Sequence, residues 1–174
     1  MDLYKILMSE DIVNSIRDNY DCLIKIIPEI NDMVGFEHKH PHHHLDVWEH
    51  TLLALSMSHN DFVIRLSLLL HDIGKPHSCI EGEVRHFYKH PQASCYISYK
   101  ILKRLGYEDD FINKVCCLIL KHDTPIEEND IKNNYELCKL LYQIQYCDAL
   151  AHAPDKLEKR KMYLKKIEKR LYDK

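Results

Sequence analysis

The chain has 174 residues, only four glycines and six prolines, and a formal net charge of −3. This length suits one domain with a sizeable core, and the composition excludes collagen-like and low-complexity disordered proteins. The small net charge argues against wholesale coating of nucleic acid, and neither a secretory leader nor an apolar stretch of membrane-spanning length occurs, so we expect a cytoplasmic protein without membrane association.

Seven helices are predicted from apolar residues that recur at helical spacing, with capping residues before them and glycine or proline after several of them. Their approximate ranges are 9–27, 46–58, 60–74, 91–105, 109–122, 134–152 and 155–172. The third helix is apolar on most sides, which is typical of a helix at the centre of a bundle. We therefore predict an all-α fold, a bundle of six or seven helices.

Two irregular connectors separate these helices. Residues 29–44 have no periodic pattern and carry five histidines, which favours a long loop lying against the following helices. Within residues 75–90, apolar and polar side chains alternate in CIEGEVRHF, which suggests a small hairpin. We expect a single domain over residues 1–174, in which a motif-bearing core at about 41–154 carries the first and last helices packed on it.

Thirteen histidines are the compositional anomaly of the sequence. Because imidazole is the commonest side-chain metal ligand, a metal site is the first function to consider. The seven cysteines are an odd number without a C-x-x-C pair. The sequence therefore predicts neither a disulfide framework nor a zinc ribbon.

A histidine and an aspartate stand side by side where the apolar helix 60–74 ends, in LLLHDIGKP. Burying Asp72 beside His71 is costly unless a cation or hydrogen bonds compensate the charge. A divalent ion compensates it directly, and imidazole with carboxylate suits Fe, Mn, Ni, Co or Zn. Further ligands must come from other helices, and the candidates are His50 in VWEHTLLAL and Asp148 in YCDALAHAP.

These four residues occur in the order of the signature of the HD superfamily of metal-dependent phosphohydrolases, which the chain resembles. More narrowly, PHHHLDVWEHTLLAL, LLLHDIGKP, RHFYKHPQAS, KHDTP and YCDALAHAP are similar to the HD domain of bacterial CCA-adding tRNA nucleotidyltransferases and its stand-alone relatives. The similarity covers roughly Pro41 to Pro154. It implies an HD-domain bundle with one or two divalent ions (Fe, Mn, Ni, Co, Zn or Mg), the first bound by His50, His71, Asp72 and Asp148.

The resemblance also implies residues for a second ion or for the substrate. Two-metal members of the superfamily carry two more histidines between the HD pair and the late aspartate, and the matching positions are His90 and His122. His86, four residues before His90, is a further candidate. The other interpretation is that these histidines only bind phosphate or cap their helices. For the late aspartate itself, Asp123 and Asp155 are alternatives to Asp148.

Catalytic roles follow from the same resemblance. Asp72 would ligate the metal and orient or deprotonate the attacking water. Lys75 could place its ammonium group on a phosphate oxygen, and the alternative is that it is simply solvated. From the histidine tract of residues 38–44, we expect His44 to contribute to the pocket and the others to be exposed.

The implied activity is hydrolysis of a nucleotide-like phosphomonoester or (cyclic) phosphodiester, with 2′,3′-cyclic phosphodiesters and nucleoside monophosphates as leading substrates. The G-S-x-x-x-D-x-D nucleotidyltransferase signature is absent, so this chain is not expected to add nucleotides to tRNA. One alternative is a non-catalytic module that binds a nucleotide or a partner and uses its metal structurally. Another is guanosine polyphosphate hydrolysis.

RNA is a further partner to consider, because residues 155–174 include nine basic and four acidic side chains. A basic helix of this kind can contact RNA. The same segment also has an apolar stripe at helical spacing. The stripe favours the simpler interpretation, in which the helix packs on the bundle and its lysines form the solvated face.

Overall fold

The computed structural model describes residues 2–39 and 45–172, apart from the side chains of residues 154–156. Across this part of the chain the regular structure is helical, and β structure is limited to two isolated bridges, Glu37 with Asp46 and Ile80 with His86. The predicted all-α class is confirmed. The hairpin suggested for residues 75–90 is wrong, because pairing there is limited to one bridge.

The described helices follow the predicted ranges closely. In chain order they are α1 (Leu3–Leu7), α2 (Ile12–Asp18), α3 (Tyr20–Ile26), the 3-10 helix η1 (Pro28–Asp32), α4 (Val47–Ser56), α5 (Phe62–Leu70), α6 (Lys75–Ser78), α7 (His90–Arg104), α8 (Asp109–Lys121), α9 (Glu128–Asn133), α10 (Tyr135–Leu150) and α11 (Pro154–Tyr172). The additions to the predicted bundle are short elements, namely α1, η1, α6 and α9, together with the division of the first predicted helix into two.

That division occurs at Asn19, which ends α2 and precedes α3. Its side-chain amide donates to the carbonyl of Ser15 at 2.8 Å. Local side-chain hydrogen bonds of this kind let asparagine compete with regular helical structure. A periodic apolar pattern does not report such a break, because both short helices keep their apolar residues on the side that faces the core.

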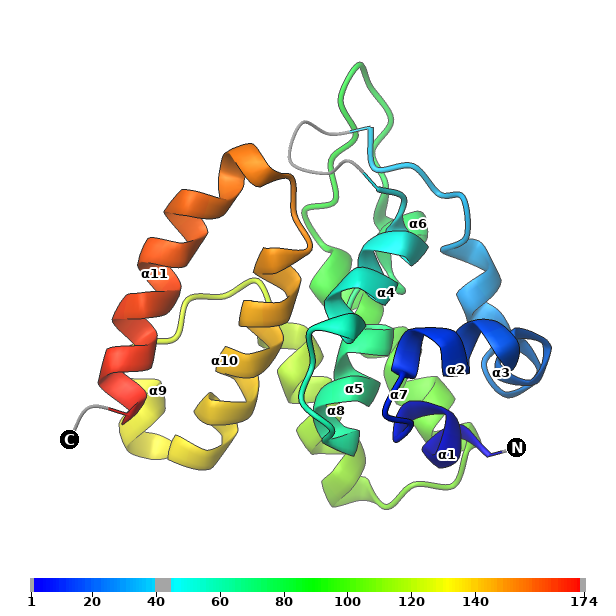
Figure 1. Ribbon diagram of the computed structural model, residues 1–174, viewed down its shortest axis with the longest axis horizontal. Coiled ribbons are helices and arrows are strands. Elements are labelled where there is room, and N and C mark those ends of the chain that lie inside the picture. Colours follow the sequence, from blue (N-terminus) through cyan, green and yellow to red (C-terminus); the bar gives the residue numbers. More distant parts are fainter. Residues whose placement is uncertain (1, 40–44, 173–174) are drawn as a thin grey trace.

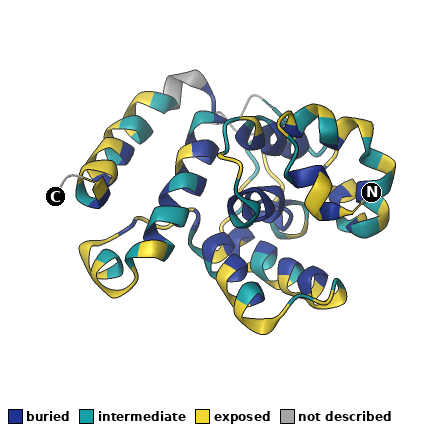
Figure 2. Ribbon diagram, turned by 60° about the horizontal axis from the view of Figure 1, so that its bottom comes forward, coloured by how far each residue is buried: buried dark blue, intermediate teal, exposed yellow. Residues whose placement is uncertain are grey.

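The central helix is α5, in which every side chain from Ile64 to Leu70 is buried. α4, α8 and α10 pack against it, while α7 pairs with α8 and α11 pairs with α10 (Figure 1). Figure 2 shows buried residues concentrated where these helices meet, and α11 exposed over much of its surface. Among the described residues, no helix is both long enough and apolar enough to cross a bilayer. The domain boundaries expected from the sequence stay a prediction.

The turn after α5 lies against the N-terminal half of α7. Gly74 donates its backbone N–H to the hydroxyl of Ser94 at 2.9 Å. A Cβ atom at Gly74 would lie 2.3 Å from the backbone nitrogen of Ser94, closer than real Cβ contacts. Glycine is therefore required for this close approach of two backbones. The contact fixes the direction in which the chain leaves α5, and with it the placement of His71 and Asp72.

Candidate metal centre

Four of the sequence-predicted residues meet in the interior of the bundle. His50 comes from α4, His71 and Asp72 from the end of α5, and Asp148 from α10. His50 Nε2 lies 2.9 Å from Asp148 Oδ1 and 3.7 Å from Asp72 Oδ2. His71 Nε2 lies 3.5 Å and 3.3 Å from the same two oxygens. We call these four residues the first cluster, and all of them are buried.

Each histidine of the first cluster is oriented by a backbone carbonyl. His71 Nδ1 donates to the carbonyl of Leu68 at 2.7 Å, and His50 Nδ1 donates to the carbonyl of Ala151 at 3.2 Å. With Nδ1 used in this way, the Nε2 atom of each ring faces the cluster. This is the arrangement by which proteins fix the tautomer and orientation of metal-binding histidines.

Several polar atoms in the first cluster lack hydrogen bonds of good geometry. Among the described residues these are His71 Nε2 and both carboxylate oxygens of Asp72, although Oδ2 of Asp72 also forms an ion pair with Lys75 at 2.7 Å. Leaving such atoms buried and unpaired is costly unless something else satisfies them. Ligands about 2.1 Å from one ion lie roughly 3 to 3.5 Å from each other, close to the 2.9 to 3.7 Å that separate these histidine nitrogens from the carboxylate oxygens. The residues therefore fit a divalent cation.

The electrostatics of the cluster agree with this chemistry. Burial alone would lower the pKa of His71, but the carboxylates of Asp72 and Asp148 outweigh it and raise that pKa to about 10. Burial would likewise raise the pKa of Asp72, yet His71 and Lys75 hold it well below its usual range. The carboxylates thus stay ionised in the protein interior and need positive charge beside them.

His90 and His122 form a second cluster with Asp72. Their Nε2 atoms are 3.1 Å apart, and they lie 3.3 Å and 3.8 Å from Asp72 Oδ1, respectively. Their Nδ1 atoms donate to the carbonyls of Phe87 and Ile119 at 2.8 and 2.6 Å. Two imidazole nitrogens this close need a proton or a cation between them. Asp72 therefore presents Oδ2 to the first cluster and Oδ1 to the second.

Asp123 adjoins the second cluster. Its Oδ2 atom lies 3.3 Å from His90 Nε2 and 3.9 Å from His122 Nε2, and its side chain is 44% exposed. Asp148, not Asp123, lies among the histidines of the first cluster, and the side chain of Asp155 is outside the described part of the structure. A sequence signal for Asp123 existed, because His122 and Asp123 repeat at the end of α8 the His–Asp pair that ends α5.

Lys75 and His38 lie next to Asp72. Lys75 Nζ is 2.7 Å from Asp72 Oδ2 and 3.0 Å from His38 Nε2. Burial and the neighbouring ammonium group lower the pKa of His38 to about 2, so its neutral ring donates from Nδ1 to the carbonyl of Leu45 at 2.8 Å. Lys75 is buried, which excludes simple solvation. The expectation that His38 would be exposed is wrong, because it is buried at the site, and the tract's other histidines, His44 included, lie outside the described residues.

His152 and Arg160 lie beside Asp148 at the site, and neither was predicted from the sequence. His152 follows Asp148 by one helical turn, and its Nδ1 donates to the Asp148 carbonyl at 2.7 Å. Burial lowers the pKa of His152 to about 4. Arg160 on α11 places Nη1 3.4 Å from Asp148 Oδ2. The four-residue spacing in DALAH was an available signal for His152, whereas Arg160 depends on how α11 packs.

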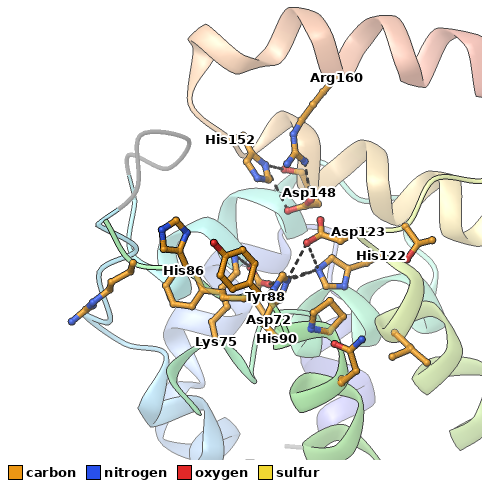
Figure 3. A pocket seen from close by; sticks show the side chains of 16 residues that line it. Asp72, Lys75, His86, Tyr88, His90, His122, Asp123, Asp148, His152 and Arg160 are labelled. Atoms are coloured by element: carbon orange, nitrogen blue, oxygen red, sulfur yellow. Dashed lines mark hydrogen bonds and ion pairs between the residues drawn. The ribbon is translucent and has the colours of Figure 1, made fainter. Parts of the chain in front are cut away.

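Both clusters border a pocket of about 470 Å³ (Figure 3). Asp72, Asp148, His90 and His122 line it, whereas His50 and His71 are not among its lining residues. His86 lines the same pocket as an exposed side chain and belongs to neither cluster. An ion held by the clusters would therefore face open space on one side.

Comparison with known proteins agrees with this architecture, since residues 42–164 match the family model of the HD domain. The chain belongs to the HD domain family. It is 27% identical over 139 residues to the A-adding tRNA nucleotidyltransferase of Deinococcus radiodurans, covering 74% of this chain and 32% of that protein. It is 26% identical over 139 residues to the multifunctional CCA protein of Legionella pneumophila strain Paris, covering 78% and 33%. The chain thus spans about a third of the length of these relatives.

Proposed function

We propose that this HD domain is a metal-dependent phosphohydrolase acting on a nucleotide-like phosphomonoester or (cyclic) phosphodiester. One observation carries the proposal. Four histidines, each held through Nδ1 by a backbone carbonyl, direct Nε2 toward the two oxygens of one buried carboxylate, Asp72. Membership of the HD domain family supports the same reaction class.

The ligand sets follow from the clusters. His50, His71, Asp72 and Asp148 would hold one ion, and Asp72 would share a second ion with His90 and His122. Imidazole with carboxylate is a donor set that suits Fe, Mn, Ni, Co or Zn. Ions bound there supply the positive charge that activates water and stabilises the phosphoryl oxygens.

The remaining polar residues have roles that need no nucleophile from the protein. Lys75 neutralises Asp72 and fixes the direction of its carboxylate. Asp123 is half exposed at the pocket, so its carboxylate can accept a proton from the attacking water. Arg160 also lines the pocket, where a guanidinium group can bind phosphate oxygens. Lys75 and Arg160 would thus supply positive charge at the site, and Asp123 would supply a proton acceptor.

The open pocket favours catalysis over a structural metal. A structural site is closed by protein ligands, whereas a catalytic site keeps a position open to water or substrate. Here Asp72 and Asp148 are buried but line the pocket, so an ion bound between them would face the pocket on one side. One of the two relatives is named as a tRNA nucleotidyltransferase, which supports a nucleotide or an RNA terminus as the substrate of this chain.

The proposal is tested by stripping the protein with a chelator and reloading it with one divalent metal at a time. The reloaded protein is assayed on nucleoside monophosphates, 2′,3′-cyclic nucleotides and a guanosine polyphosphate. We expect turnover of at least one nucleotide ester by the reloaded protein and by Asp110→Ala, which removes an exposed aspartate of α8. Asp72→Ala should lose both the metal and the turnover while circular dichroism stays unchanged.

Three results would count against the proposal. Full metal content and turnover in Asp72→Ala would remove this carboxylate from the site. A loaded protein that binds metal but leaves every ester intact would instead be a non-catalytic binding module. Turnover confined to the guanosine polyphosphate would favour the alternative hydrolase.

A further inference from the structure

Two aromatic side chains form a stacked pair at the pocket. The rings of His86 and Tyr88 are 5.1 Å apart at their centroids and inclined by only 7°. Both residues line the pocket that borders the metal clusters (Figure 3). Tyr88 is 74% exposed although His86 covers one of its faces. The opposite face of the Tyr88 ring is therefore open to a ligand.

The side chain between these two residues points away from the pair. His86 lies in an isolated bridge, and Tyr88 begins the turn that leads into α7. Phe87, the residue between the pair, turns inward and packs its ring 6.4 Å from that of Phe36 and 5.9 Å from that of His38. His86 and Tyr88 consequently share the outer side of the segment.

The stacked pair is held in place before any ligand arrives. His86 exchanges backbone hydrogen bonds with Ile80, at 2.9 and 3.2 Å, and the N–H of Arg85 donates to the carbonyl of Lys39 at 3.2 Å. The carbonyl of Phe87 accepts from His90 Nδ1 at 2.8 Å. The segment that carries the pair is thus tied directly to a histidine of the second cluster.

Arg85, the positively charged residue next to His86, already has interaction partners. Arg85 pairs with Glu81 at 2.8 Å, and its guanidinium lies 4.6 Å from the centre of the Phe36 ring. It is therefore poorly placed to bind a phosphate in the pocket. The recognition element that this segment offers to a ligand is the flat aromatic surface of Tyr88 and His86.

We propose that Tyr88, backed by His86, stacks against the nucleobase of a substrate whose phosphate lies at the metal clusters. This inference rests on the proposed function and adds the way in which the nucleoside part is recognised. The pocket volume of about 470 Å³ falls within the range of roughly 300 to 1,000 Å³ for small-molecule sites. Every base has a π face, so stacking selects nucleotides over other phosphate esters without selecting one base.

The experiment compares adenosine 5′-monophosphate with ribose 5-phosphate, in which a hydroxyl group at C1 replaces the base. Calorimetric binding and steady-state kinetics are measured on the metal-loaded protein, Tyr88→Ala, Tyr88→Phe and His86→Ala. The control is Tyr96→Ala, since Tyr96 is 60% exposed on α7 and does not line the pocket. Because Tyr88 is also exposed, its replacement should not disturb folding.

Stacking on an aromatic side chain is worth about 1 to 3 kcal/mol per base, or roughly tenfold or more in affinity. We expect Tyr88→Ala to weaken adenosine monophosphate binding about tenfold and to leave ribose 5-phosphate binding unchanged. Tyr88→Phe and Tyr96→Ala should behave as the parent, and His86→Ala should show a smaller loss.

Binding separates failure of this inference from failure of the proposed function. Base-dependent binding that is lost in Tyr88→Ala, without turnover of either ester, supports the stacking role and counts against phosphatase activity. A parent that binds both esters equally, or a Tyr88→Ala variant that weakens both equally or neither, would overturn the stacking proposal.

Discussion

At the scale of single residues, the site depends on histidines whose rings are fixed by nearby carbonyls. His71 and His122 each follow the last residue of a helix and donate from Nδ1 to the carbonyl three residues earlier. The sequence could predict these positions, because the HD resemblance supplied their order. The burial of His38 could not be predicted, because it lies in an irregular tract where no period indicates which ring turns inward.

His90 and His122 provide the residue-scale prediction. Replacing either one with alanine should lower the metal content of the loaded protein from about two ions per chain to about one. The reason is that both face Oδ1 of Asp72, whereas His50 and His71 face Oδ2. Elemental analysis after equilibrium dialysis measures the change, with the exposed His59 replaced by alanine as the control.

If a single ion is present in the parent and its content stays the same in both variants, the second-ion role is wrong. The two histidines would then be substrate contacts, provided that the apparent affinity for the nucleotide ester falls. Unchanged metal content together with unchanged kinetics would leave them with only a structural role.

At the scale of secondary structure, the long helices were predictable and the irregular connections were not. Apolar period and capping residues located α4, α7, α8, α10 and α11 to within a few residues. The break at Asn19 and the single bridge at Ile80 depend on local hydrogen bonds that no apolar pattern encodes. Gly74 is a similar case. Its position in the sequence predicts the end of a helix, but it does not show that glycine is also needed there for close contact with α7.

Gly74→Ala is the element-scale prediction. The added Cβ would lie 2.3 Å from the backbone nitrogen of Ser94, so the turn after α5 must shift. Overpacking of this kind typically costs about 1 to 3 kcal/mol. We expect a lower melting temperature and, because the turn carries His71 and Asp72, weaker metal binding.

Gly106→Ala is the matched control, since Gly106 has a φ of +78° but no atom within 4 Å of an added Cβ. It should lose stability through backbone strain alone, by about 1 to 2 kcal/mol, and keep its metal affinity. A Gly74→Ala protein with parental stability and parental metal affinity would show that the close contact does not position the site.

At the scale of the whole molecule, the centre is assembled from helices that are distant in sequence. His50 and Asp148 are in contact across the bundle, and α5 delivers the HD pair between them. The apolar period of a helix predicts which of its faces is buried, but it does not predict which other helix packs against that face. Ligands from distant helices can therefore be predicted only through the signature of a family. The contribution of α11 through Arg160 therefore became visible only in the fold.

The most direct test of the central claim is anomalous diffraction from crystals of the protein reloaded with one transition metal. We predict a strong peak among His50 Nε2, His71 Nε2 and the facing oxygens of Asp72 and Asp148, about 2.0 to 2.2 Å from each. A second peak beside His90 and His122 would show the two-ion form. Loaded crystals with no anomalous peak at the first cluster, or with peaks only at exposed histidines, would contradict the account.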